Sequence, residues 1–271
     1  MNTKDLITQL VKTSFKLRYN NSFLGFIWVF IKPFVSFLVN YIVWTTLFQI
    51  KEEYFALKLM LGIMMWTFLN EGIIFGMNGL LDKAGIILKV NFPRYTAIIA
   101  STLMSVINFV INIILFMIIF GIYNFTTSGV IMNGFDIIGI LIALTGIFIS
   151  MITTYLICLS LSYFLSIIVI RVRDLQHILE LFFSIAFWFT PILVSAELVL
   201  ASNPDNVNSL YYKVLINNPF GWIIDFARNS VIYGNFNGID KVLWVLLVVT
   251  ILSILGSYYF ERKVKTVAEY F

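Results

Sequence analysis

Long apolar stretches without charged residues recur along the chain and alternate with short polar segments. A helix needs about 20 apolar residues to cross the roughly 30 Å hydrocarbon core of a bilayer. Lipid offers no partner to backbone N–H and C=O groups, and these stretches are too long and too evenly apolar for barrel strands. The pattern therefore predicts an all-α integral membrane protein with six transmembrane helices. We place these helices at residues 23–50, 59–81, 95–122, 137–168, 178–194 and 242–260.

The segment before the first predicted span is amphipathic. On a helix, the apolar side chains between Leu6 and Leu17 share one side, whereas Asp5, Lys12 and Lys16 lie on the other. The pattern predicts an N-terminal amphipathic interfacial helix over residues 1–20. This helix could serve as a membrane anchor alone or also as a docking surface for a cytosolic partner. The basic residues suit both roles, so both interpretations stay open.

The longest polar segment covers residues 195–241 and lies between the fifth and sixth predicted spans. It is too polar to cross a bilayer. Asparagine precedes proline at Pro204 and at Pro219, and proline commonly begins or interrupts a helix. We expect short helices at the outer surface of the membrane, delimited by these two prolines.

Composition and charge support a membrane protein and suggest its orientation. Hydrophobic residues make up 60% of the chain and charged residues 12%, against about 25% charge in soluble domains. The net charge of +4 does not indicate nucleic acid binding, because the 18 basic residues are scattered.

The distribution of basic residues predicts the orientation in the membrane. With both termini in the cytosol, the basic residues left outside are Lys51, Lys58, Lys213, Arg228 and Lys241. The positive-inside rule thus predicts an N-in, C-in topology. The chain is then one membrane domain of residues 1–271, with the six-helix bundle over 23–260 and a cytosolic tail over 261–271.

The sequence contains no recognisable catalytic or metal-binding pattern. His177 is the only histidine and Cys158 the only cysteine, no Gly-rich phosphate loop precedes a lysine, and acidic residues do not fall at metal-ligand spacing. We therefore expect a protein that is not an enzyme by itself and that binds no metal and no cofactor.

Two acidic residues lie within predicted spans. Glu71 is near the middle of the second span, where a charged side chain costs about 2.5–3.5 kcal/mol on insertion scales. It should therefore face protein or water, or be protonated. It could line a transport route, or it could form a hydrogen bond with Asn70, Asn78 or another helix, and both interpretations stay open. Glu180 follows His177 by three residues, which favours a local pair over a proton relay.

Aromatic side chains crowd the first, second and fifth predicted spans. Rings pack well in any helical bundle, but a ring face also suits the apolar face of a sugar. Together with Glu71, the candidates for a substrate pathway are Tyr41, Trp44, Trp66, Phe68, Phe75, Phe183, Phe187 and Trp188. For each ring, core packing and a role in a saccharide route remain alternatives.

Four segments carry a pattern beyond composition. They are Phe15-Lys16-Leu17-Arg18-Tyr19 before Lys32-Pro33, Val90-Asn91-Phe92-Pro93-Arg94, Val172-Arg173-Asp174-Leu175-Gln176 before Thr190-Pro191-Ile192, and Asn218-Pro219 with Arg228. In this order they resemble segments of the ABC-2 type permeases that export lipid-linked polysaccharides of the O-antigen, teichoic acid or rhamnan type. One departure is Val172, where members of that family often have an aromatic residue.

The resemblance implies a function and a set of partners. It implies the permease subunit of an ATP-driven exporter in the bacterial plasma (inner) membrane, which moves a polyprenyl-linked polysaccharide from the cytosol to the outer side. Two copies would pair as a homodimer and bind two ABC ATPase subunits, which use ATP and Mg²⁺. The alternatives are an ABC-2 permease for a drug, lipid or small hydrophobic compound, an ion-coupled transporter using Glu71 and His177, and a structural membrane subunit.

The resemblance also implies two groups of functional residues on the cytosolic side. Coupling to the ATPase is implied for Arg171, Arg173, Asp174, Leu175, Lys12, Lys16 and Arg18. A cytosolic gate is implied for Asp82, Lys83, Lys89, Phe92, Pro93 and Arg94.

Overall fold

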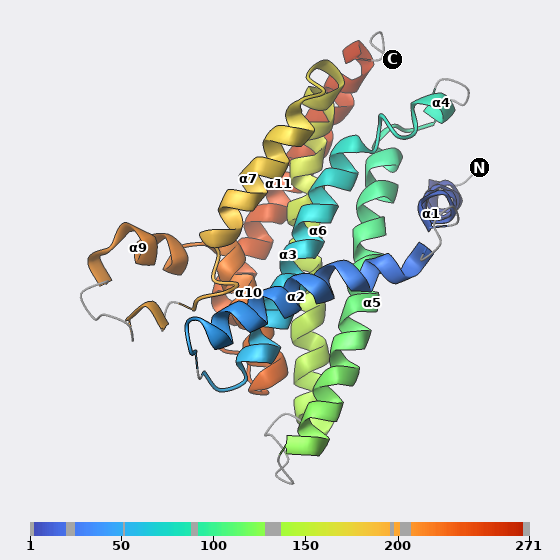
Figure 1. Cartoon of the computed structure of the whole chain (residues 1–271). Helices are drawn as coiled ribbons and strands as arrows, with labels where there is room; N and C mark the ends of the chain where they lie inside the picture. The colour runs from blue at the N-terminus through green and yellow to red at the C-terminus, as the bar shows by residue number, and fades with distance from the viewer. Residues whose placement is uncertain are drawn as a thin grey trace.

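The chain folds into a bundle of long helices with shorter helices packed beside and between them (Figure 1). The computed structural model describes residues 3–19, 25–50, 52–87, 92–127, 137–195, 198–200 and 207–267. Its elements are α1 (Thr3–Tyr19), the 3-10 helix η1 (Gly25–Ile27), α2 (Trp28–Thr46), α3 (Phe55–Asn78), α4 (Ala84–Ile87), α5 (Tyr95–Thr127), α6 (Ile137–Arg171), α7 (Leu175–Trp188), α9 (Leu210–Ile216), α10 (Pro219–Ile232) and α11 (Ile239–Val267). No strand occurs in these described ranges, so the predicted all-α class is confirmed.

Five helical segments are long and apolar enough to cross a membrane. They are Gly25–Thr46, Phe55–Asn78, Tyr95–Tyr123, Ile137–Arg171 and Ile239–Val264. Each matches one of the predicted spans, namely the first four and the sixth, because an unbroken apolar run of this length is a strong signal. The chain is a multi-pass membrane protein.

The fifth predicted span, residues 178–194, is wrong as one continuous helix. Its helical part, α7, has 14 residues and is about 21 Å long at a rise of 1.5 Å per residue, which is shorter than a hydrocarbon core. The Phe189 amide donates to the Ala186 carbonyl at 3.2 Å, and the chain turns at Thr190 and Pro191. Proline lacks the N–H that a continuing helix would use and clashes with the preceding turn. The apolar composition continues past this point, so hydrophobicity alone suggested a longer helix.

Helix α3 forms the centre of the molecule and packs closely on α5 and α6 (Figure 1). Two glycines one turn apart make this approach possible. A Cβ atom on Gly72 would lie 2.5 Å from the Cys158 sulfur, and one on Gly76 would overlap the Ser162 side chain. In lipid, helices associate through van der Waals contact between such small residues rather than through the hydrophobic effect. The Gly-x-x-x-Gly spacing at 72–76 is therefore the main packing feature of the core.

Helix α10 lies inside the bundle and not at its surface. It begins at Pro219, as the sequence predicted, and the Asn218 side chain accepts hydrogen bonds from the Phe220 and Gly221 amides. The segment contains two short helices, α9 and α10, and most of α10 is buried against α6, α3 and α11. Their place at the outer surface of the membrane stays a prediction. The segment 195–241 is polar overall, so the sequence did not reveal that one of its helices, α10, is mostly buried. The other predicted break, Pro204, lies outside the described residues.

Helices α2 and α7 each leave an apolar face without cover. Only 11% of the α2 span window is buried, and Figure 1 shows α2 crossing the other long helices obliquely. We call these residues the uncovered faces: Val35, Leu38, Val39 and Ile42 of α2, and Ile178, Leu181, Phe182, Ile185 and Trp188 of α7. Apolar patches of this kind require lipid or another protein surface.

The amphipathic character of α1 is confirmed. Leu6 and Leu10 are buried together with Ala100 of α5, whereas Lys12 and Lys16 are exposed. Leu17, near the end of the helix, is 69% exposed and therefore does not join the packed side. Helix α1, α4, the turn between α6 and α7, and the C-terminal end of α11 lie toward the same end of the molecule (Figure 1).

Candidate functional site

A cavity of about 710 Å³ lies where the end of α1 and the start of α2 meet the middle of α3. We call it the junction cavity. Its lining comprises Arg18, Tyr19, Gly25, Trp28, Val29, Lys32, Trp66, Thr67, Asn70, Glu71, Ile74 and Phe75. The volume is within the range of about 300–1,000 Å³ that small-molecule sites occupy. The lining combines two cations, one acid, amide and hydroxyl groups, and several rings, which is the residue mixture of a binding site for a polar ligand.

The two cations reach the junction cavity from different helices. The Arg18 guanidinium lies over the Phe75 ring, 3.6 Å from its centroid, and Lys32 comes from the first turns of α2. Both side chains interact with the charge of Glu71. The resemblance implied coupling to an ATPase for Arg18 together with Lys12 and Lys16, which stays a prediction; in the structure the Arg18 side chain lines the cavity.

A chain of hydrogen bonds connects α1, α5 and α3 beside the cavity. The Tyr19 hydroxyl donates to Asn108 Oδ1 at 3.0 Å, and Asn108 Nδ2 donates to Glu71 Oε2 at 2.7 Å. Glu71 therefore has an interhelical partner, as one of its two predicted interpretations required, and it also lines the cavity. Neither Asn70 nor Asn78 is that partner, since Asn78 donates to Gln176 and Asn70 Oδ1 is buried without a hydrogen bond from the described residues.

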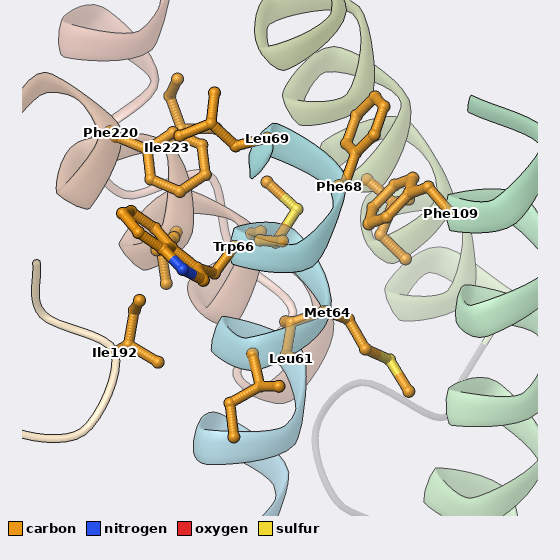
Figure 2. Packing of buried hydrophobic residues seen from close by; sticks show 14 of the residues in the cluster. Leu61, Met64, Trp66, Phe68, Leu69, Phe109, Ile192, Phe220 and Ile223 are labelled. Carbon is orange, nitrogen blue, oxygen red and sulfur yellow. The ribbon is translucent and has the colours of Figure 1, made fainter. Parts of the chain in front are cut away.

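The predicted pathway rings do not form one group. Trp66 and Phe75 line the junction cavity, whereas Phe68 lies on the other side of α3 and stacks on Phe109 at 4.6 Å between centroids (Figure 2). Phe183 and Phe187 pack edge-on against Trp66 at 6.0 and 5.8 Å. Their contact holds α7 against α3 and gives the Trp66 ring its orientation.

The remaining predicted rings lie elsewhere on α2 and α7. Tyr41 stacks with Phe37 and Phe55 at 5.6 and 6.4 Å, and Trp44 stacks on Phe48 at 4.5 Å. Trp188 is 58% exposed and belongs to the uncovered face of α7. Helical periodicity could not separate these positions, because it does not show which faces meet.

The predicted gate residues between α3 and α5 are held in different ways. Lys83 is buried and donates to Ser101 at 2.5 Å, and burial lowers the pKa of its ammonium group to about 8. The Arg94 guanidinium donates to the Val264 carbonyl at 2.7 Å, and with Phe92 and Pro93 it lines a second pocket of about 450 Å³ beside the end of α11. Asp82 lines a smaller pocket with Arg18 and Lys83. Lys89 lies outside the described residues.

The predicted coupling residues lie at the α6–α7 turn, where Arg171, Arg173 and Asp174 are exposed and Leu175 is half-buried. Arg171 ends α6, Arg173 and Asp174 form the turn, and Leu175 begins α7. His177 and Glu180 lie on the exposed first turns of α7 with Nδ1 and Oε2 3.7 Å apart, so the predicted local pair is confirmed.

Arg228 belongs to one of the four segments that carry the family resemblance, but no structural role was predicted for it. Its side chain is 8% exposed and donates to three backbone carbonyls, those of Lys58 at 3.1 Å, Pro191 at 2.7 Å and Ile192 at 2.9 Å. Asp225 accepts a further bond from it at 3.1 Å. The turn after α7 leaves carbonyls without helical partners, and such groups need internal donors at membrane depth. An arginine within an apolar helix was the available signal, because a buried cation must have partners.

These features define a class: an all-helical, multi-pass membrane protein with a charged, ring-lined cavity at the junction of its amphipathic helix α1 and its first membrane helix. No protein-family model matches the chain. Among curated proteins, it is 28% identical over 211 residues to the O-antigen export system permease protein RfbA of Myxococcus xanthus, covering 74% of this chain and 76% of that protein. It is 21% identical over 258 residues to the protein of the same name from Klebsiella pneumoniae, covering 95% and 92%. The predicted resemblance to polysaccharide-export permeases is confirmed.

Proposed function

We propose that this chain is the permease subunit of an ATP-driven exporter that moves a lipid-linked polysaccharide across the bacterial plasma membrane to its outer side. The observation that carries the proposal is the similarity to O-antigen export permeases, which extends over 95% of the chain in one case. A cavity with cations, acceptors and ring faces supports a sugar-bearing substrate rather than a small hydrophobic compound.

The proposed topology has six crossings with both termini in the cytosol. Five long spans alone would put the two chain ends on opposite sides, but α1 and the end of α11 lie toward the same end of the molecule (Figure 1). Helix α7 starts at that end, and α11 starts far from it and returns. We infer that α7, the turn held by Arg228, and α10 together make the remaining crossing, with polar backbone shielded inside protein as lipid requires.

The uncovered faces support a homodimer. A second copy related by a twofold axis would cover the exposed side chains of α2 and α7, since the same surface on each subunit meets its counterpart in such a pair. The pathway for the polysaccharide would run between the two copies. Aromatic side chains such as Trp188 would then face it and offer weak contacts that do not depend on sugar sequence.

Two ABC ATPase subunits, which bind ATP and Mg²⁺, would dock at the end of the molecule that carries Arg173, Asp174, Lys12 and Lys16. All four side chains are exposed. Closure of the ATPase pair on ATP would push this turn and α1, and rigid-body motion of α7 and α2 would follow.

The test is complementation of a strain that lacks the gene, with surface polysaccharide measured by labelling of intact cells. The wild-type chain should restore surface polysaccharide and copurify with a cytosolic ATPase. A chain with Arg173→Glu and Asp174→Arg should insert normally but lose most of both readouts, because the docking turn carries reversed charges. Lys213→Glu, an exposed charge change on α9, is the matched control and should behave as wild type. Unchanged surface polysaccharide in the deletion strain would contradict the proposed function.

A further inference from the structure

We propose that the junction cavity binds the glycosyl-phosphate head of the exported lipid, with the phosphate at Arg18 and Lys32 and the first sugar at Trp66, Asn70 and Glu71. The inference rests on the proposed function and assigns the chemical group that this chain recognises. It also gives Arg18 a role in ligand binding instead of coupling.

The charge of the cavity favours an anion. Arg18 and Lys32 contribute two positive charges against the single carboxylate of Glu71. Neither cation forms an ion pair with another described residue, and both side chains are exposed to the cavity and its opening. The contact of Arg18 with the Phe75 ring face orients the guanidinium while leaving N–H donors for a phosphate, to which arginine binds in a bidentate manner.

The deeper wall of the cavity supplies acceptors that a phosphate cannot use but a sugar can. Asn70 lines the cavity, and its Oδ1 has no donor among the described residues, so this amide has hydrogen-bonding capacity that a ligand hydroxyl could use. Glu71 uses one carboxylate oxygen to accept from Asn108 at 2.7 Å, and a carboxylate has about four lone-pair sites. Sugar hydroxyls are donors, and the small exposed part of the Trp66 ring borders the cavity beside these acceptors, where it could contact the apolar face of a sugar.

The opening of the cavity suits a hydrocarbon chain. Leu17 precedes Arg18 and is 69% exposed, and Ile27 precedes Trp28 and is 54% exposed. Neither residue lines the cavity, but each is the neighbour in sequence of a lining residue and is exposed at the junction of α1 with α2. A lipid whose head occupies the cavity could therefore leave its chain in the bilayer, which a soluble sugar phosphate does not require.

The relative order of the groups matches the order in the ligand. The two cations come from the end of α1 and the first turns of α2 and are exposed, whereas Asn70 and Glu71 of α3 are half-buried and therefore further from the surface. A lipid-linked glycan presents its hydrocarbon, phosphate and first sugar in that sequence. A membrane phospholipid shares the phosphate and hydrocarbon but lacks the pyranose ring, so the acceptors and the ring face are the part of the site that distinguishes the two.

The experiment measures binding to the purified full chain in nanodiscs by quenching of tryptophan fluorescence. The probes are a geranylgeranyl-phosphate-linked glucose, geranylgeranyl phosphate without sugar, phosphatidylglycerol and inorganic phosphate. We expect the glucose-bearing lipid to bind at least about fivefold more tightly than the bare lipid phosphate, since one or two hydrogen bonds and a ring contact are added. Phosphatidylglycerol and inorganic phosphate should compete weakly.

The matched variants remove two positive charges each. Arg18→Gln with Lys32→Gln should weaken binding of the glucose-bearing lipid about 100-fold, since each charge-assisted contact is worth about tenfold or more. Lys12→Gln with Lys16→Gln removes the same charge from the exposed side of α1 and should change binding less than about twofold, the size of a screened surface effect. Asn70→Leu should reduce the preference for the glucose-bearing lipid over the bare lipid phosphate by about fivefold.

Three outcomes would overturn the assignment. Equal losses in both double variants would show a general surface-charge effect, equal binding of phosphatidylglycerol would show a phospholipid site, and tight binding of inorganic phosphate would show a site for a free anion. Thermal melting of each variant reports whether it is folded. Should the deletion strain lose surface polysaccharide while the Arg18 and Lys32 double variant binds as wild type, the proposed function stands and only this assignment fails.

Discussion

Helices α2 and α3 are both apolar, membrane-length segments, yet they differ sharply in how the rest of the chain covers them. In α3, 72% of the span window is buried, compared with 11% in α2, although the α2 window is slightly more hydrophobic. What separates them is side-chain size. Helix α3 carries Gly62, Gly72 and Gly76 against its neighbours, whereas no glycine or alanine occurs in α2. Within lipid, apolar composition inserts a helix but does not pack it, and small residues decide which helices come close.

Helices α10 and α7 have 14 residues each and differ in the same way in how much of their surface the rest of the chain covers. Helix α10 buries most of its residues and fixes Arg228 on the turn after α7, whereas only Phe183 is buried in α7. Helices α3 and α10, with the sides of α5 and α6 that face them, thus form a half that is covered within a single chain. The other half includes α2 and α7 and, with the outer sides of α5, α6 and α11, presents apolar surface that lipid or another protein must cover.

The largest expected effect comes from filling the close contact at the centre of the packed half. Gly76→Leu would push its side chain into Ser162 and Thr102 and should lower the free energy of unfolding by about 3 kcal/mol or more, since neither α6 nor α5 can move away without disrupting other contacts. Thermal melting in detergent, followed by size-exclusion chromatography, measures the loss. Gly85→Leu is the control, because a Cβ at Gly85 meets no atom within 4 Å. Equal stability of the two variants would show that this contact is not what holds α3.

The next effect in size comes from the arginine that supports the turn after α7. Arg228→Met keeps the apolar stem but leaves the carbonyls of Lys58, Pro191 and Ile192 without their donor, and we expect a loss of about 3 kcal/mol. The measurement is denaturant unfolding in mixed micelles. Asp225→Asn serves as the control, because Asp225 is 54% exposed and its pairing with Arg228 contributes little. If Arg228→Met is as stable as Asp225→Asn, the three carbonyl groups do not depend on Arg228, and water donates hydrogen bonds to them instead.

The smallest effect tests the boundary between the two halves with neighbouring residues. Phe187→Ala removes a ring packed on Trp66 and should cost about 2 kcal/mol, below the range for fully buried rings because Phe187 is only half-buried. Trp188→Ala changes an exposed ring and should leave monomer stability nearly unchanged, while lowering the dimer fraction in crosslinking. Equal destabilisation of the monomer by Trp188→Ala and Phe187→Ala would contradict the assignment of Phe187 to the packed side of α7 and of Trp188 to its uncovered face.

Local sequence patterns were sufficient for several features. Unbroken apolar runs predicted five long spans, Asn218-Pro219 predicted the start of α10, and the i, i+3 spacing predicted the His177–Glu180 pair. Each depends on residues close together in the chain. The fifth span was placed too long because a local pattern was again the only guide. Apolar residues continue past Pro191, whereas the helix ends at Trp188.

The candidate site was recovered only in part. Glu71 was singled out as an acid within an apolar span, and Trp66 and Phe75 were candidates for a substrate pathway, but Lys32 was not assigned to the site and coupling was implied for Arg18. Asn108 gave no signal, since one asparagine in an apolar stretch is common in membrane helices. Its hydrogen bond to Glu71 joins positions 37 residues apart, which no local pattern encodes.

By itself, the sequence determined that this chain is helical, enters the membrane several times and begins with an amphipathic helix, because those properties follow from the spacing of apolar residues along one segment. Only the tertiary structure decided that Arg18 meets Glu71 in a cavity, that Arg228 is buried, and that α2 stays uncovered. Periodicity defines the faces of a helix, but the facing partner depends on which side chains are small enough to allow close approach and on where the backbone needs donors.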